Sequence, residues 1–138
     1  MARSFKELLV WQRAVELALA VYRMAGQFPD FERYGLASQM RRASISISSN
    51  IAEGAGRAST GEFLQFLGNA RGSRFELESQ FVIVRGLGLG SAERALEAEA
   101  LCQETGKLLS LLIQSVRAKS LAPRTTLAAA QPQSRSQT

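Results

Sequence analysis

The sequence of 138 residues contains no histidine and a single cysteine. Histidine is the commonest general acid–base residue and the commonest transition-metal ligand, so its absence argues against both kinds of site. The lone Cys102 excludes an intramolecular disulfide, and its position on an apolar stripe predicts a core residue and not a nucleophile. We therefore expect no metal and no cofactor, and we assign no catalytic residue.

Long hydrophobic runs are also missing. The longest early apolar stretches are residues 8–11 and 17–22, far short of the roughly 18 residues that cross a bilayer. Gln12, Arg13 and Glu16 interrupt the apolar region that an export signal would need. We expect a cytoplasmic protein without a membrane span.

Glycine and proline contribute only 11 and 3 residues, too few for a collagen-like or low-complexity chain. Hydrophobic residues make up 46% of the sequence, near the globular average. A chain of this length and composition is typical of one folded domain with a continuous core.

The charge is unevenly distributed along the chain. Lysine and arginine together number 17 against 12 acidic residues, a formal net charge of +5, and 14 of the 17 cations are arginine. Lys119, Arg124 and Arg135 carry +3 of this charge in the last twenty residues, which leaves +2 for residues 1–118. Nucleic-acid binding would therefore depend on where the arginines lie, or on the tail acting as a basic arm.

Apolar residues recur at alternating spacings of three and four, the signature of a helix face. Proline, glycine and serine separate four such segments. The pattern predicts an all-α, antiparallel up-down four-helix bundle over residues 1–121. Its helices are expected at about residues 5–26, 31–53, 60–87 and 92–119. Residues 122–138 have no such periodicity and predict a disordered basic tail.

Local signals suggest where the helices begin and end. Ser4 with Glu7, and Ser59 with Glu62, have the spacing of a capping box at a helix N-terminus. Gly54 is placed to end the second helix as a C-cap. The glycine-containing loops at residues 54–57 and 86–91 match neither a Walker A nor a dinucleotide-binding pattern, so we interpret them as helix breaks in preference to phosphate sites.

The first predicted helix carries two apolar seams instead of one. One seam consists of Leu8, Trp11, Val15, Ala18, Tyr22 and Ala25, and the other of Val10, Ala14, Leu17, Val21 and Met24. A single stripe usually suffices inside a monomeric bundle. The extra seam indicates either a subunit contact or a wider intramolecular core.

Polar residues form a stripe on each of the two middle helices. The stripes consist of Arg42, Ser46, Asn50 and Glu53 on one helix and Asn69, Ser73, Glu76 and Gln80 on the other. A short loop makes these helices antiparallel neighbours, so the stripes can face each other. They predict a hydrogen-bond network, a solvated surface, or a contact surface for a ligand or RNA. Glu53 and Glu76 could act as acid and base, but no nucleophile or metal set accompanies them.

Arginines cluster in two places and next to the glycine loop. Arg33, Arg41 and Arg42 form the first group, Arg71, Arg74 and Arg85 the second, and Arg57 follows the loop. Arginine is suited to phosphate and base recognition. The alternative is a solvated helix surface whose charge is balanced by Glu62, Glu76 and Glu78.

Several sequence strings together resemble a known family. They are residues 9–14 (LVWQRA), Phe28-Pro29, residues 35–36 and 39–43 (GL and QMRRA), Ser46-Ile47, residues 50–54 (NIAEG), Gly56-Arg57, residues 70–73 (ARGS) and Glu76-Leu77. In these strings the chain is similar to the bacterial 23S rRNA intervening sequence proteins, also called S23 ribosomal proteins. The resemblance covers residues 5–116, and residues 122–138 lie outside it.

The resemblance implies a four-helix bundle that assembles as a homopentamer. It also implies a structural similarity to the accessory proteins of diversity-generating retroelements, which bind nucleic acid and a reverse transcriptase. The family's motif positions are Arg42, Asn50, Glu53, Gly54, Arg57, Ser73 and Glu76, with Ser46 joining the polar network. No catalytic role is implied for any of them.

We expect a non-enzymatic, oligomeric bundle that binds nucleic acid, most simply structured RNA, through surface arginines. The residues that we expect to bind are Arg33, Arg41, Arg42, Arg57, Arg71 and Arg74. The alternative is a protein-interaction scaffold, or an accessory subunit that docks a partner enzyme such as a reverse transcriptase.

Overall fold

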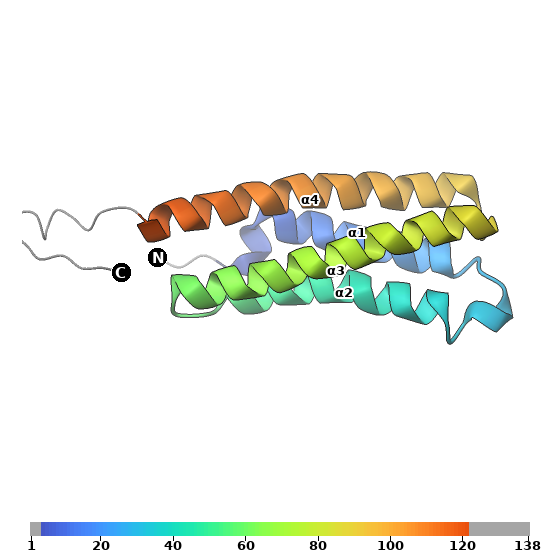
Figure 1. Ribbon diagram of the computed structural model, residues 1–138, viewed down its shortest axis with the longest axis horizontal. Helices are drawn as coiled ribbons and strands as arrows, with labels where there is room; N and C mark the ends of the chain where they lie inside the picture. Colours follow the sequence, from blue (N-terminus) through green and yellow to red (C-terminus); the bar gives the residue numbers. More distant parts are fainter. Residues whose placement is uncertain (1–3, 122–138) are drawn as a thin grey trace, which may run out of the picture.

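The computed structural model of the chain describes residues 4–121. Its four helices are α1 (Leu9–Ala25), α2 (Leu36–Ala55), α3 (Thr60–Leu87) and α4 (Ala92–Leu121). Consecutive helices run antiparallel, and each packs against the next, with α4 closing the bundle against α1 (Figure 1). The predicted all-α, four-helix fold is confirmed. The predicted tail, residues 122–138, lies outside the described part of the chain.

The core lies along the axis of the bundle and is built from one stripe of each helix. Its largest fully buried aliphatic side chains are Leu17, Met24, Met40, Ile47, Ile51, Leu67, Leu77 and Leu109. Burying each such side chain contributes about 1.5–3 kcal/mol. No helix within residues 4–121 is long and apolar enough to cross a bilayer.

The two seams of α1 differ in burial. The seam from Val10 to Met24 is the core seam, since none of its five side chains is more than 4% exposed. The other seam lies mostly at the edge of the bundle: Ala25 is buried, but Trp11 is half-buried against the ring of Phe5 and Tyr22 is 45% exposed. The seam from Val10 to Met24 is therefore part of the core. A subunit contact through the other seam stays a prediction.

The helix predicted from residue 5 is divided into two pieces. Ser4 Oγ accepts a hydrogen bond from Lys6 N (3.1 Å), and a short 3-10 turn, Phe5–Glu7, follows. Leu8 then adopts an extended backbone conformation, and α1 begins at Leu9. Because the extended residue interrupts the helical hydrogen bonds, the predicted capping box does not start a continuous helix.

The second helix begins five residues later than predicted. Pro29 introduces a 3-10 turn, Asp30–Glu32, and α2 begins only at Leu36. Glu32 Oε1 accepts a hydrogen bond from Leu36 N (3.1 Å), so a side chain from the turn caps the start of α2. Pro29 disfavours the α conformation of Phe28, the residue before it, so the chain leaves the helical path there and forms a tight turn.

Gly54 lies inside α2 and does not end it, so its prediction as a C-cap is wrong. The C-cap is Gly56. A Cβ atom at Gly54 would lie 2.7 Å from the Cβ atom of Phe66 and 3.1 Å from Cδ1 of Phe63. Glycine at this position therefore allows the close approach of α2 and α3.

The ends of α3 follow from local chemistry. Ser59 Oγ accepts a hydrogen bond from Glu62 N (3.1 Å) at its start. Gly88 (φ 65°) and Gly90 (φ 67°) follow its end in the left-handed region, which glycine enters without steric cost. Ser91 Oγ then accepts from Arg94 N (3.2 Å) at the start of α4.

Candidate functional site

A hollow lies between α1 and α2 and is lined by arginines. Its volume is about 330 Å³, and Tyr22, Ser38, Arg41, Arg42 and Ile45 line it. The guanidinium of Arg41 lies 5.6 Å from the centroid of the Tyr22 ring, within the range of a cation–π contact. Periodicity along α2 brings Ser38, Arg42 and Ile45 to one side of that helix, where α1 supplies Tyr22.

A second hollow continues from the first toward the connection between α1 and α2. It measures about 210 Å³, and Arg41 lines both hollows. Arg33 and Asp30 also line the second hollow, so a guanidinium and a carboxylate lie on its wall. We call the two hollows together the α1–α2 groove.

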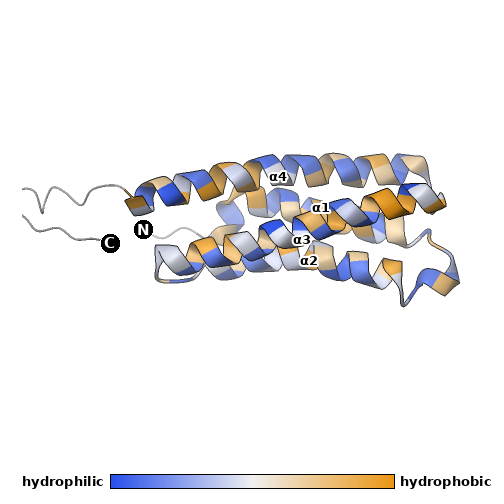
Figure 2. Cartoon of the chain, in the orientation of Figure 1, coloured by the Kyte–Doolittle hydropathy of each residue, from blue (hydrophilic) through white to orange (hydrophobic). Residues whose placement is uncertain are grey.

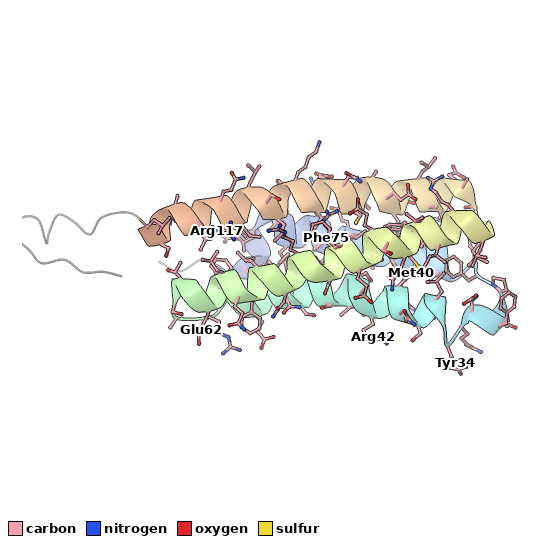
Figure 3. The ribbon with its side chains drawn as sticks, viewed as in Figure 1. Tyr34, Met40, Arg42, Glu62, Phe75 and Arg117 are labelled. Carbon is pink, nitrogen blue, oxygen red and sulfur yellow. The ribbon has the colours of Figure 1, made fainter. Side chains whose placement is uncertain are left out.

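Three arginines at this groove have no carboxylate partner. Arg33, Arg41 and Arg42 form no ion pair with any residue in the described range 4–121. Arg42 is exposed on α2, and Figure 3 shows its side chain pointing away from the bundle. An unpaired guanidinium keeps all its donors for an external acceptor. The first predicted arginine cluster is thus available to a ligand.

The other predicted arginines are mostly engaged within the chain. Arg57 pairs with Glu53 on α2 (3.0 Å), and its guanidinium lies 4.8 Å from the Phe66 ring centroid. Arg85 makes two hydrogen bonds to the carboxylate of Glu99, 2.6 and 2.8 Å long, and this pairing raises its pKa above the usual value. These arginines stabilise neighbouring elements and have fewer free donors.

Arg74 ties α3 to α4 and is 12% exposed. Its Nη1 donates to the backbone carbonyl of Cys102 (3.3 Å) and contacts Cys102 Sγ (3.7 Å), while Nη2 lies 3.5 Å from Glu78. Burial raises the pKa of the Cys102 thiol, and the nearby Arg74 charge opposes part of that shift. Cys102, which is 2% exposed, is a core residue, and Arg74 is its interhelical partner.

Arg71 is the remaining predicted cation. It has no ion pair in the described part of the chain, and its guanidinium lies 5.7 Å from the Phe75 ring centroid. Arg71 lies on α3, whereas the unpaired arginines of the groove lie on or before α2. The predicted arginines therefore do not form one continuous surface of free cations.

The two polar stripes meet through a small part of their length. Ser46 Oγ and Ser73 Oγ share a hydrogen bond of 2.8 Å between α2 and α3. Asn50 Nδ2 donates to Ser46 O (2.8 Å) and Ser46 Oγ (3.0 Å) within α2. These three residues form a half-buried network that links the helices.

The predicted carboxylates lie outside that network. Glu53 is exposed and pairs with Arg57, while Glu76 is exposed and accepts a hydrogen bond from Gln80 Nε2 (3.3 Å). Neither carboxylate therefore lies in a buried pocket of the kind that a catalytic acid or base usually needs. Among the described residues, no three His, Cys, Asp or Glu side chains form a cluster able to hold a metal ion.

Aromatic side chains beside the groove are the residues that the sequence reasoning missed. Phe31 is 79% exposed and Tyr34 is 88% exposed. The guanidinium of Arg33 lies 5.8 Å from the Tyr34 ring centroid. The available signal was a pair of aromatic residues flanking an arginine just before a helix, outside the apolar periodicity of the core helices.

The outward face of α3 is a second unusual surface. Gly61, Gly68, Gly72 and Gly86 share this face, and a Cβ atom at any of them would meet nothing within 4 Å among the residues described. Phe75 (49% exposed) and Val82 (70% exposed) lie beside them. Figure 2 shows that strongly hydrophobic residues gather toward the C-terminal end of α3. Each exposed helical glycine costs about 1 kcal/mol relative to alanine.

These features define an all-α four-helix bundle with an arginine-lined groove and a glycine-rich outer helix face. The family model described as 23S rRNA-intervening sequence protein matches residues 6–111, and the chain belongs to that family.

A solved structure has the same fold. It is a protein of unknown function from the S23 ribosomal protein family of Bacteroides thetaiotaomicron VPI-5482, with a TM-score of 0.70 and 20% sequence identity. The similarity covers 77% of this chain and 96% of the other. Among curated proteins, none matches the chain.

Proposed function

We propose that this protein is a non-enzymatic nucleic-acid-binding bundle whose ligand is structured RNA. The observation that carries the proposal is the α1–α2 groove, where Arg33, Arg41 and Arg42 have no ion pair among the described residues. Guanidinium groups bind phosphate through paired hydrogen bonds, and they do so best when no carboxylate competes. The proposal includes the predicted cytoplasmic location, which cell fractionation tests.

The first hollow of the groove is better suited to phosphates than the second. Asp30 lies in the second hollow with Arg33 and repels an anion there. Arg41 and Arg42 share the first hollow with Ser38, Tyr22 and Ile45, and no carboxylate lines it. A phosphate backbone is therefore expected to follow Arg41 and Arg42.

Titrations of a fluorescent RNA hairpin by anisotropy test this proposal. Neutralising phosphates releases counterions, so log affinity should fall linearly with log salt between about 50 and 200 mM. Arg42→Ala should weaken binding about tenfold and reduce the salt slope by about one. Arg57→Ala is the matched control because it removes the same charge from an arginine that Glu53 already pairs.

Two results would contradict the proposal. One is no detectable binding at about 50 mM salt, where electrostatic binding is strong. The other is an equal loss for Arg42→Ala and Arg57→Ala, which would mean that only net charge matters. A chain that ends at Leu121 should retain most of the affinity, because the groove lies within residues 4–121.

A second candidate function is a protein scaffold, and the glycine-rich face of α3 favours it. Exposed glycines next to Phe75 and Val82 let another helix approach closely, and this gain offsets their cost to helix stability. The docking of a partner enzyme such as a reverse transcriptase belongs to this candidate, whereas assembly as a homopentamer, which the family resemblance implies, is expected under both candidates.

Sedimentation tests self-association directly. Assembly should give a mass well above the 15.0 kDa of one chain at micromolar concentration. Gly72→Leu should shift the mass toward the monomer, whereas the control Gln114→Leu, at an exposed position on α4, should not. A monomeric wild-type chain would contradict the predicted self-association. Nuclease treatment of a pull-down separates the candidates, since it releases partners only if RNA joins them.

A further inference from the structure

Two aromatic side chains are displayed to solvent at the end of the bundle. The buried Phe28 and the turn after Pro29 anchor this segment, while Phe31 and Tyr34 point outward. Figure 3 shows Tyr34 beyond the start of α2, on the same side of the bundle as Arg42. Tyr22, 45% exposed, adds a third ring in the α1–α2 groove.

Hydrogen bonds hold the segment that carries these rings. Glu32 N donates to Pro29 O (2.9 Å), Arg33 N to Asp30 O (3.0 Å) and Gly35 N to Glu32 O (3.2 Å). Glu32 Oε1 accepts from Leu36 N, which joins the turn to α2. The rings are therefore presented on a defined backbone, which lowers the entropy cost of binding a partner.

We propose that Phe31, Tyr34 and Tyr22 stack unpaired nucleobases of an RNA whose phosphates contact the arginines of the groove. This inference rests on the proposed RNA-binding function and specifies its ligand as a single-stranded segment, such as a loop or a bulge. Bases within a duplex are already stacked and cannot reach a protein ring, whereas unpaired bases stack on aromatic side chains. The protein should therefore select unpaired RNA over duplex RNA.

Charge favours a nucleic acid over an apolar protein as the occupant. An arginine lies over two of the rings, Arg33 over Tyr34 and Arg41 over Tyr22. A purely apolar partner would bury these unpaired guanidiniums without a counter-charge, which is costly. Each nucleotide of a single strand brings a base that can stack on a ring and a phosphate that can bind a guanidinium.

The nearby carboxylates determine which arginines the phosphates of the RNA can contact. Glu32 is engaged by the N-terminal amide of α2, which compensates part of its charge. Asp30 remains in the second hollow with Arg33. We therefore expect the phosphates to run past Arg41 and Arg42, with the bases turned toward the rings, and Asp30→Asn to tighten binding.

The test uses the full chain and two fluorescent probes at about 50 mM salt, a 12-nucleotide oligouridylate and a blunt RNA duplex of the same length. The single strand should bind at least about tenfold more tightly than the duplex. Tyr34→Leu and Phe31→Leu should each weaken single-strand binding about tenfold, because leucine keeps an apolar side chain but removes the π face. Neither variant should change the affinity for the duplex.

Two control variants separate stacking from other effects. Tyr34→Phe keeps the ring and should keep the affinity within about twofold. Phe75→Leu removes another exposed aromatic that lies beside arginines, on α3 and not in the groove, and should leave binding unchanged. Circular dichroism should show that all variants are folded, because the Phe31 and Tyr34 side chains are largely in solvent.

The outcomes distinguish this inference from the function on which it rests. If neither probe nor the hairpin binds, the proposed function fails, and this inference fails with it. If Arg42→Ala weakens RNA binding but both leucine variants bind normally, the groove remains a phosphate site and the stacking inference is overturned. A loss of self-association in Tyr34→Leu with unchanged RNA affinity would also overturn it, since the rings would then contact a second copy.

Discussion

The guanidinium of Arg74 on α3 occupies the space that a side chain at Gly106 on α4 would need. A Cβ atom at position 106 would lie 2.7 Å from both Cζ and Nε of Arg74. The notch left by glycine lets Arg74 reach the backbone carbonyl of Cys102. The two residues thus form one interhelical contact, and neither can be understood from its own helix.

Gly106→Ala should destabilise the wild-type chain by about 1 kcal/mol, because the new methyl displaces Arg74 from its hydrogen bond, and this loss of about 2 kcal/mol outweighs the gain in helix propensity of about 1 kcal/mol. In an Arg74→Ala background the same substitution should stabilise the chain by up to about 1 kcal/mol, since alanine is the better helix former. Urea unfolding of the four proteins in this double-mutant cycle measures the change of sign. Additive effects would show that the two residues are independent.

Gly54→Ala should destabilise the protein by about 2 kcal/mol. The added methyl meets the Cβ atom of Phe66, which cannot rotate away, so α2 and α3 must move apart. Gly68→Ala is the matched control on α3, where the methyl enters open space and should stabilise the isolated chain by up to about 1 kcal/mol. Thermal or urea unfolding compares the two, and equal effects would contradict the close helix contact.

Ser73→Ala should cost about 1 kcal/mol because it removes the hydrogen bond to Ser46 across the α2–α3 interface. Ser46→Ala should cost more, since Asn50 then also loses an acceptor. Ser48→Ala removes only a bond to Ile45 O in its own helix and should stay within about 0.5 kcal/mol of wild type. A Ser73→Ala variant as stable as the Ser48→Ala control would mean that the interhelical bond contributes nothing.

Cys102 should react with iodoacetamide only when the protein unfolds, because its side chain is buried and its pKa is raised. Above about pH 8.5 the unfolded thiol ionises while the folded thiol keeps its proton. This contribution to folding stability is therefore complete below that pH and is lost as the pH rises toward the folded pKa. Unfolding of wild type and Cys102→Ala at pH 7 and pH 9.5 measures the difference. Rapid labelling of the native protein would contradict the burial of the thiol.

Several features could be predicted because they depend on neighbouring residues alone. The apolar periodicity predicts four helices, and Ser59 with Glu62 places the start of α3. The start of α2 at Leu36 was missed because a 3-10 turn and the Glu32 side chain act before it, and neither has a periodic signal.

The functional surface was predicted only in part. The cluster of Arg33, Arg41 and Arg42 is visible in the sequence, but the sequence treats Arg74 as an equal candidate. Arg74 is engaged because Cys102 lies 28 residues away in the chain and next to it in space. The exposed rings of Phe31 and Tyr34 were missed because exposure depends on which residues pack over a side chain.

The sequence by itself determined the all-α class, the number of helices and most of their breaks, since these follow from local periodicity, proline and glycine. Tertiary structure alone decided which seam of α1 is the core, why position 54 is glycine, and which arginines are left without a carboxylate. The physical reason is that burial, close approach and ion pairing are properties of two helices together. Residues such as Ser46 and Ser73, 27 positions apart, become partners only when the helices pack.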